Sequence, residues 1–266
     1  MLIDYIPVWA LLFVTSATVL FAVEMGYRAG KTVTRNTDGE RESPVSAIAA
    51  AILGLQAFML AFTFSIVSDR YDMKKSLVRE EANAIRTAWN RSDFLSESDR
   101  VRTKLLLKGY VDERVRIASL HDPELATVSL GNAVLSHHEM WAIAVANGRL
   151  DMNSDIGALY VESLNQIFEL HALRVNIGLQ SRIPSAIWFV LLGLLVFGMA
   201  GIGYQAAVAD SQRPRASFIL AFAFSLVVTL IAALDHPGNT LVKVSQQPMI
   251  NLQMEMGDTP ASSTEP

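Results

Sequence analysis

The chain has 266 residues, of which 51% are hydrophobic and only 18% charged, with a net charge of −4. Soluble domains average about 25% charged residues, so this composition excludes an ordinary soluble globular protein. The apolar excess lies in four blocks without Asp, Glu, Lys or Arg, of 19, 26, 27 and 19 residues: Tyr5–Val23, Ser43–Ser68, Ile183–Ala209 and Ala216–Leu234. As a helix, each block is long enough to cross a hydrocarbon core about 30 Å thick.

Other features of the composition exclude further classes. The absence of cysteine excludes disulfides, zinc–thiolate sites, iron–sulfur clusters and cysteine nucleophiles. The nearly balanced charge gives no reason to expect a nucleic-acid partner. The first block follows Asp4 instead of a basic segment, and no small-residue cleavage site follows Val23, so we expect a retained span.

We therefore predict an all-α integral membrane protein with four transmembrane helices and a helical extramembrane insert between helices two and three. No segment shows the sustained alternation of a strand. The predicted parts, in chain order, are spans at 5–25 and 45–68, the insert at 69–182, spans at 184–206 and 216–234, and a polar tail at 235–266 that is disordered at its end.

The insert has the pattern of an amphipathic helical bundle. Apolar residues at helical spacing predict helices over 77–89, 101–118 and 125–146. Pro123 is expected to end the second of these helices, because proline cannot continue the hydrogen-bond ladder. A fourth helix is predicted to begin at Asn153 or Ser154, either of which is a suitable N-cap, and to run towards span three.

The charge pattern leaves the membrane orientation open. The two short loops between spans hold six Lys and Arg residues, and six more lie in the flanks of the insert. Short loops weigh more heavily in the positive-inside rule, which favours cytosolic loops. The basic residues directly after span two favour a cytosolic insert instead.

Span two carries polar residues at regular spacing. Gln56, Thr63 and Arg70 recur every seven residues and therefore share one helical face, which should meet protein or water and not lipid. In one interpretation, symmetric copies of this helix surround a pore lined by Gln56, Phe62, Thr63 and Arg70, with phenylalanine as an apolar constriction. In the other, Gln56 and Thr63 make hydrogen bonds between helices of one subunit.

A charged cluster is predicted where the insert joins spans two and three. Acidic and amide residues after span two are expected to meet arginines from the segment that enters span three. This would clamp the two stems together, or form a charged vestibule that concentrates ions. The residues are Asp69, Glu80, Glu81, Asn83, Arg174 and Arg182.

The sequence shows no catalytic or metal-binding motif. His137, His138 and Glu139 are adjacent, which points neighbouring side chains about 100° apart on a helix and fails the spacing of a zinc-binding helix. We therefore predict no catalytic residues, no metal, no cofactor and no enzymatic activity. Small residues at Gly193, Gly198, Gly201 and Gly203 predict close helix packing.

Several strings resemble the bestrophin-like DUF4239 family of bacterial membrane proteins, and the resemblance extends from about residue 47 to 252. They include Leu60-Ala61-Phe62-Thr63-Phe64-Ser65, Asp69-Arg70-Tyr71-Asp72, Glu80-Glu81-Ala82-Asn83-Ala84-Ile85, Leu164-Asn165-Gln166-Ile167-Phe168, Ser181-Arg182-Ile183-Pro184 and Val244-Ser245-Gln246-Gln247-Pro248. The resemblance implies four spans, a large helical insert and an oligomeric pore.

We accordingly expect a multi-pass protein of the bacterial inner membrane whose partners are the lipid bilayer, further copies of the chain and inorganic ions. The leading hypothesis is a homo-oligomeric ion channel with span two lining the pore. The alternative is a non-conducting, membrane-anchored sensor or scaffold whose insert binds a protein partner.

Overall fold

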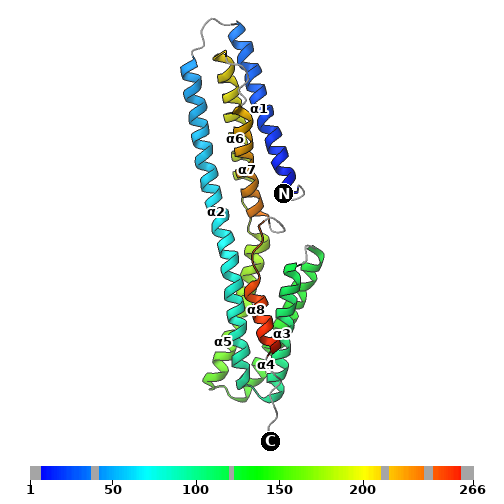
Figure 1. The fold of residues 1–266 in the computed structure, drawn as a ribbon. Helices are drawn as coiled ribbons and strands as arrows, with labels where there is room; N and C mark the ends of the chain where they lie inside the picture. Colours follow the sequence, from blue (N-terminus) through cyan, green and yellow to red (C-terminus); the bar gives the residue numbers. More distant parts are fainter. Residues whose placement is uncertain (1–6, 37–41, 120–122, 211–215, 237–241, 259–266) are drawn as a thin grey trace. The chain divides into compact units, whose positions relative to one another are not determined.

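The computed structural model describes residues 7–36, 42–119, 123–210, 216–236 and 242–258. All regular elements in these ranges are helical and no strand occurs among them, which confirms the all-α prediction (Figure 1). The chain divides into two compact units. The first comprises residues 1–70 and 182–242, and the second comprises residues 71–181 and 243–266.

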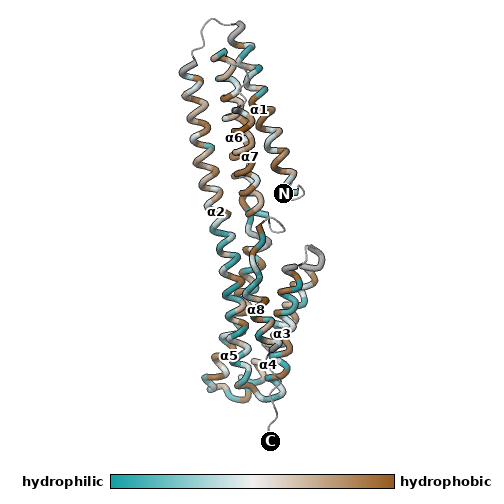
Figure 2. The backbone as a smooth tube through the Cα atoms, viewed as in Figure 1, coloured by the Kyte–Doolittle hydropathy of each residue, from teal (hydrophilic) through white to brown (hydrophobic). Residues whose placement is uncertain are grey.

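The first unit contains the four predicted spans. They are α1 (Val8–Asn36), the first part of α2 (Glu42–Arg91), α6 (Ser185–Val208) and α7 (Ala216–Asp235). Each is long and apolar enough to cross a membrane, and these segments are coloured as hydrophobic along most of their length (Figure 2). Their inward faces form one core to which all four helices contribute.

Glycines let the backbones of α1 and α6 touch. A Cβ atom added to Gly203 of α6 would lie 2.0 Å from the carbonyl oxygen of Val23, and one added to Gly26 of α1 would lie 1.9 Å from that of Ala200. Small residues permit this kind of close crossing between membrane helices. Gly193 differs, since a Cβ there would meet nothing within 4 Å.

Helix α2 is continuous from the first unit into the second. It has 50 residues, and neither proline nor glycine occurs after Gly54 to interrupt it. The helix predicted over 77–89 is therefore the continuation of span two and not a separate element.

The second unit packs the end of α2 with α3 (Glu97–Ser119), α4 (Pro123–Leu150), α5 (Asp155–Val175) and α8 (Gln247–Asp258). Pro123 occupies the first position of α4, where its missing N–H costs nothing. Of the two candidate N-caps, Ser154 takes this role, because its hydroxyl accepts a hydrogen bond from the Gly157 amide at 3.0 Å. Beyond Val175 the chain forms a π-helical turn, Asn176–Gln180, instead of continuing as an α-helix to span three.

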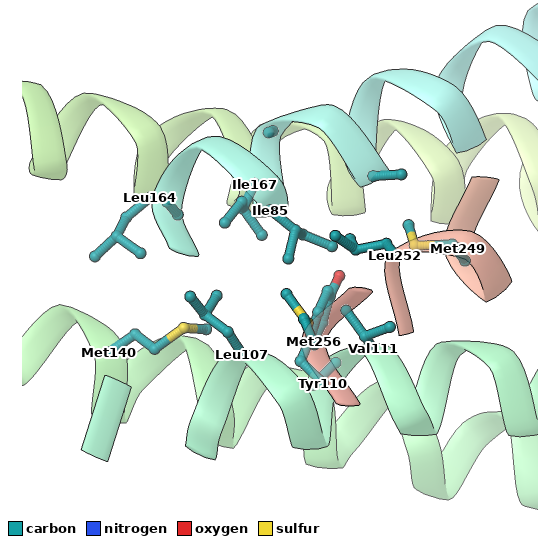
Figure 3. Packing of buried hydrophobic residues seen from close by; sticks show 14 of the residues in the cluster. Ile85, Leu107, Tyr110, Val111, Met140, Leu164, Ile167, Met249, Leu252 and Met256 are labelled. Carbon is teal, nitrogen blue, oxygen red and sulfur yellow. The ribbon is translucent and has the colours of Figure 1, made fainter. Parts of the chain in front are cut away.

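Helix α8 lies in the region 235–266, for which the sequence predicts only a polar tail. Its side chains Met249, Leu252 and Met256 lie on one helical face and are buried in the same core as Ile85 and Leu107 (Figure 3). The bidentate pair between Arg86 and Glu255 joins α8 to α2. The last eight residues of the tail lie outside the described residues.

Candidate functional site

The transmembrane part of α2 has a buried polar face. The side chains of Gln56 and Thr63 are fully buried in the core of the first unit. The Thr63 hydroxyl donates to the carbonyl oxygen of Met59 on its own helix at 2.7 Å. Neither amide atom of Gln56 has a hydrogen-bond partner within the described part of the chain. The shared face deduced from the seven-residue spacing thus points into the protomer's own bundle.

The opposite face of α2 is exposed. Phe58 and Phe62 are 65% and 54% exposed and stack with ring centroids 6.5 Å apart. Ser65 and Asp69 continue the same face towards the end of the span and are also exposed. Of the four pore-lining candidates, only Phe62 lies on this exposed face.

Arg70 belongs to an ion-pair cluster at the end of the first unit. One of its guanidinium nitrogens lies 3.6 Å from a carboxylate oxygen of Asp235, a buried residue at the end of α7. The same oxygen accepts a hydrogen bond from the backbone N–H of Ile183 at 2.9 Å, and Arg182 donates to the Asp235 carbonyl oxygen. Asp235 therefore connects the end of α7 with the end of the apolar part of α2 and with the segment that enters α6.

In the second unit, the charged cluster centres on Glu81 of α2. Its carboxylate is completely buried and accepts hydrogen bonds from Arg174 of α5, from Arg114 of α3 at 3.2 Å and from the Tyr110 hydroxyl at 2.5 Å. One carboxylate thus connects three helices. Arg174 also donates to the Gln246 side chain at 3.1 Å, which adds the segment before α8.

Two histidines extend this cluster. The Nδ1 atom of His171 lies 3.0 Å from the Tyr110 hydroxyl. Because that hydroxyl donates to Glu81, we assign Nδ1–H as the donor in this contact. The ring of His137 on α4 packs edge-on against His171 with centroids 4.9 Å apart, and against Phe168 at 4.3 Å. All four long helices of the unit therefore meet at this cluster.

Burial and charge set the protonation states of these groups. Burial alone would raise the pKa of Glu81, but the charges of Arg174 and Arg114 outweigh it and hold that pKa below its usual value. Burial and the neighbouring Glu81 charge raise the pKa of Tyr110 well above its ordinary range. Burial, reinforced by the nearby positive groups, lowers the pKa of His137 and of His171 to about 4. At neutral pH the cluster holds one carboxylate, two guanidinium groups and two neutral imidazoles.

The other members of the predicted charged cluster bond to partners outside it or are exposed. Glu80 is exposed and accepts a hydrogen bond from the Ser76 hydroxyl, while Asn83 accepts one from Arg86. Asp69 is exposed and Arg182 is bonded to Asp235, both in the first unit. Of the six predicted residues, Glu81 and Arg174 bond to each other.

Tyr110, Arg114 and His171 are not among the residues that the sequence singles out, and His137 is singled out only for a metal-site spacing that it does not meet. Tyr110 and Arg114 are four residues apart, and His171 and Arg174 three apart, so each pair shares a helical face. That spacing was a usable signal, although it does not identify the facing helix. Within the described ranges, no group of three His, Asp or Glu residues is arranged to hold a metal ion.

These features define a multi-pass helical membrane protein with a separate helical unit organised around a buried ionic cluster. The bestrophin-like domain matches residues 16–249, and the chain therefore belongs to the bestrophin-like family. Among curated proteins there is no significant match.

Two crystal structures share the fold. One is a bacterial bestrophin homologue from Klebsiella pneumoniae carrying an isoleucine-to-threonine substitution. It has a TM-score of 0.62 and 14% sequence identity, over 94% of this chain and 99% of that one. The other is a membrane protein with a glycine-to-alanine substitution, with a TM-score of 0.66 and 14% identity, over 97% and 99% of the two chains.

Proposed function

We propose that the chain assembles into a homo-oligomeric ion channel of the bacterial inner membrane, with the exposed face of α2 lining the pore. The main support is the low burial of this span. In the most apolar window of each span, 17% is buried for α2, against 28% for α1, 33% for α6 and 39% for α7. A helix that packs least within its own protomer has the most surface free for an axis shared by several copies.

The chemistry of the exposed face fits a narrow pore. Small residues such as Ala51, Gly54 and Ala61 are exposed there and permit close approach of symmetry-related helices. The stacked rings of Phe58 and Phe62 supply an apolar constriction of the kind that gates by excluding water.

The charged residue at the end of the exposed face of α2 indicates which class of ion the pore would conduct. Asp69 is exposed on the face of Phe62, whereas the charge of Arg70 is directed at Asp235. A ring of carboxylates at a pore mouth favours cations. We therefore propose a cation-conducting pore in which Asp69 concentrates the permeant ion.

The first test is the mass of the detergent-solubilised protein by light scattering with correction for detergent. A discrete closed ring is expected. A clean monomer would exclude a pore built from α2, because one copy cannot enclose an axis with that face.

Bilayer recordings then test the lining. Phe62→Ala is expected to increase conductance, while Phe197→Ala, a change at a similarly exposed phenylalanine of α6, should leave it unaltered. Asp69→Asn should reduce the preference for cations. Equal currents in Phe62→Ala and the unaltered channel would contradict the assignment of α2.

A protein-binding scaffold is the second candidate, and one observation favours it. The second unit exposes large apolar side chains, including Phe94 at 67%, Leu105 at 66% and Leu135 at 62%. Side chains of this size and polarity are suited to contact an apolar surface of a partner protein. If the oligomer carries no current in bilayers, this function becomes the better account.

A further inference from the structure

The core of the first unit contains a row of buried polar side chains that no protein group satisfies. Gln56 of α2 and Ser225 of α7 are completely buried, and neither the amide atoms nor the hydroxyl has a hydrogen-bond partner in the described ranges. The buried hydroxyls of Ser217 and Thr229, also on α7, are likewise unpartnered there. Together with Thr63, whose hydroxyl bonds to the Met59 carbonyl oxygen of its own helix, these residues form what we term the polar seam.

The helices bring these side chains to matching heights. Ala49 of α2 lies against Gly201 of α6, and Leu53 lies against Gly198, so α2 and α6 are antiparallel. The last residue of α7, Asp235, bonds to the N–H that precedes α6, so α7 also runs opposite to α6. Helices α2 and α7 are therefore parallel.

The pair between Arg70 and Asp235 sets the register of these two helices. At 1.5 Å per residue, Gln56 lies about 21 Å above Arg70, and Ser225 and Ser217 lie about 15 Å and 27 Å above Asp235. The height of Gln56 along the bundle thus lies between the heights of the two serines. By the same count Thr63 and Thr229 are nearly level, at about 10 Å and 9 Å.

The two polar faces belong to the same interior. Leu60 and Val67, which flank Thr63 on α2, and Ala221 and Val228, which flank Ser225 on α7, are members of one buried cluster. The seam therefore lies inside the protomer, on the side of α2 opposite to Phe62.

We propose that the polar seam binds water molecules in each protomer, from the ion pair of Arg70 and Asp235 to the height of Ser217. Buried polar groups are bonded either to protein or to ordered water, and an amide and hydroxyls are groups that water bridges well. The buried guanidinium nitrogen of Arg70 that lies 3.6 Å from Asp235 has no hydrogen-bond partner in the described ranges, so it is a further donor for a water in the seam. The seam admits water to the middle of the bundle, separately from a pore on the exposed face.

The absence of cysteine makes a direct test practical, since a single introduced thiol is the only one in the chain. Methyl methanethiosulfonate is small, neutral and soluble in lipid, and reacts with the thiolate. The thiolate sulfur forms a disulfide with the S-methyl group, and methanesulfinate leaves with the electron pair of the broken S–S bond. A thiol ionises when water solvates it and resists ionisation in apolar surroundings.

The comparison uses Ser225→Cys and Ile231→Cys in liposomes, at two completely buried positions of the same helix. Mass spectrometry follows the gain of the S-methyl group. Ser225→Cys is expected to react at least about tenfold faster, because its thiol is hydrated and ionises. Equally slow reaction at both positions would overturn the proposal.

A second comparison keeps the test decisive if Ser225→Cys does not fold. Ser217→Cys and Ala221→Cys are also buried on this face of α7, and only the former belongs to the seam. Adding Gln56→Leu should slow the reaction at either seam position towards that of its control. If Gln56 instead bonds directly to a serine of α7 without water, neither seam thiol should react fast. That result would overturn the water site. Neither readout depends on ion conduction, so the proposed channel function stands or fails separately.

Discussion

Replacement of Glu81 by glutamine should destabilise the second unit strongly. The change keeps the shape of the side chain but removes the negative charge that neutralises Arg114 and Arg174. Removing one partner of a buried ion pair costs about 3–5 kcal/mol, because it leaves an uncompensated buried charge. The two guanidinium groups retain 11% and 15% exposure, so water relieves part of the penalty and the lower figure, about 3 kcal/mol, is expected.

The neighbouring residue provides a matched control. Glu80→Gln makes the same chemical change one position away, at an exposed carboxylate bonded only to Ser76 among the contacts described. Surface substitutions of this kind usually alter stability by less than about 0.5 kcal/mol. The comparison therefore separates the role of the buried charge from a general effect of losing an acidic group on α2.

Urea unfolding followed by fluorescence of Trp89 and Trp141, the two tryptophans of the second unit, measures the effect. With a urea dependence of about 2 kcal/mol/M, a loss of 3 kcal/mol lowers the midpoint by about 1.5 M. Coincident midpoints for Glu81→Gln and Glu80→Gln would refute the view that the buried carboxylate holds α2, α3 and α5 together.

Three further outcomes are expected. Because folding lowers the pKa of His137 and His171 from about 6.5 to about 4, the unfolded state binds more protons between these values, and stability should decrease as pH falls through that window. The loss is roughly 2 kcal/mol per ring after allowance for hydration, and a His137→Phe variant with an unchanged pH profile in urea titrations would contradict it. Gly203→Ala should lower the thermal stability of the detergent-solubilised protein by forcing α1 and α6 apart, whereas Gly193→Ala should not, and equal melting temperatures would count against the close crossing. Leu252→Ala should cost about 2–5 kcal/mol and expose α8 to limited proteolysis, and a protease pattern identical to that of the unaltered chain would show that this leucine does not hold the helix.

The membrane architecture can be predicted from the sequence alone, because its causes are local. Four charge-free blocks of sufficient length require four spans, since charged groups are too costly in hydrocarbon. The seven-residue recurrence of Gln56, Thr63 and Arg70 likewise established that they share one face, which depends only on helix geometry.

The direction of that face was decided by the tertiary structure. Whether Gln56 points to a symmetry axis or into its own bundle depends on which surface of α2 packs against α6 and α7, and spacing along one helix contains no such information. The same holds for Glu81. The positions of opposite charges along the sequence indicated a contact between Glu81 and Arg174. The contacts with Tyr110, Arg114 and the two histidines could not be predicted, because packing decides which face of each of their helices is turned towards Glu81.

Helix α8 could not be predicted from its own sequence either. It has only 12 residues, so it is too short to be stable by itself and gains its stability from the core that it covers. A short helix of this kind forms because Ile85, Val111 and their neighbours present a complementary surface, and that surface exists only in the folded unit.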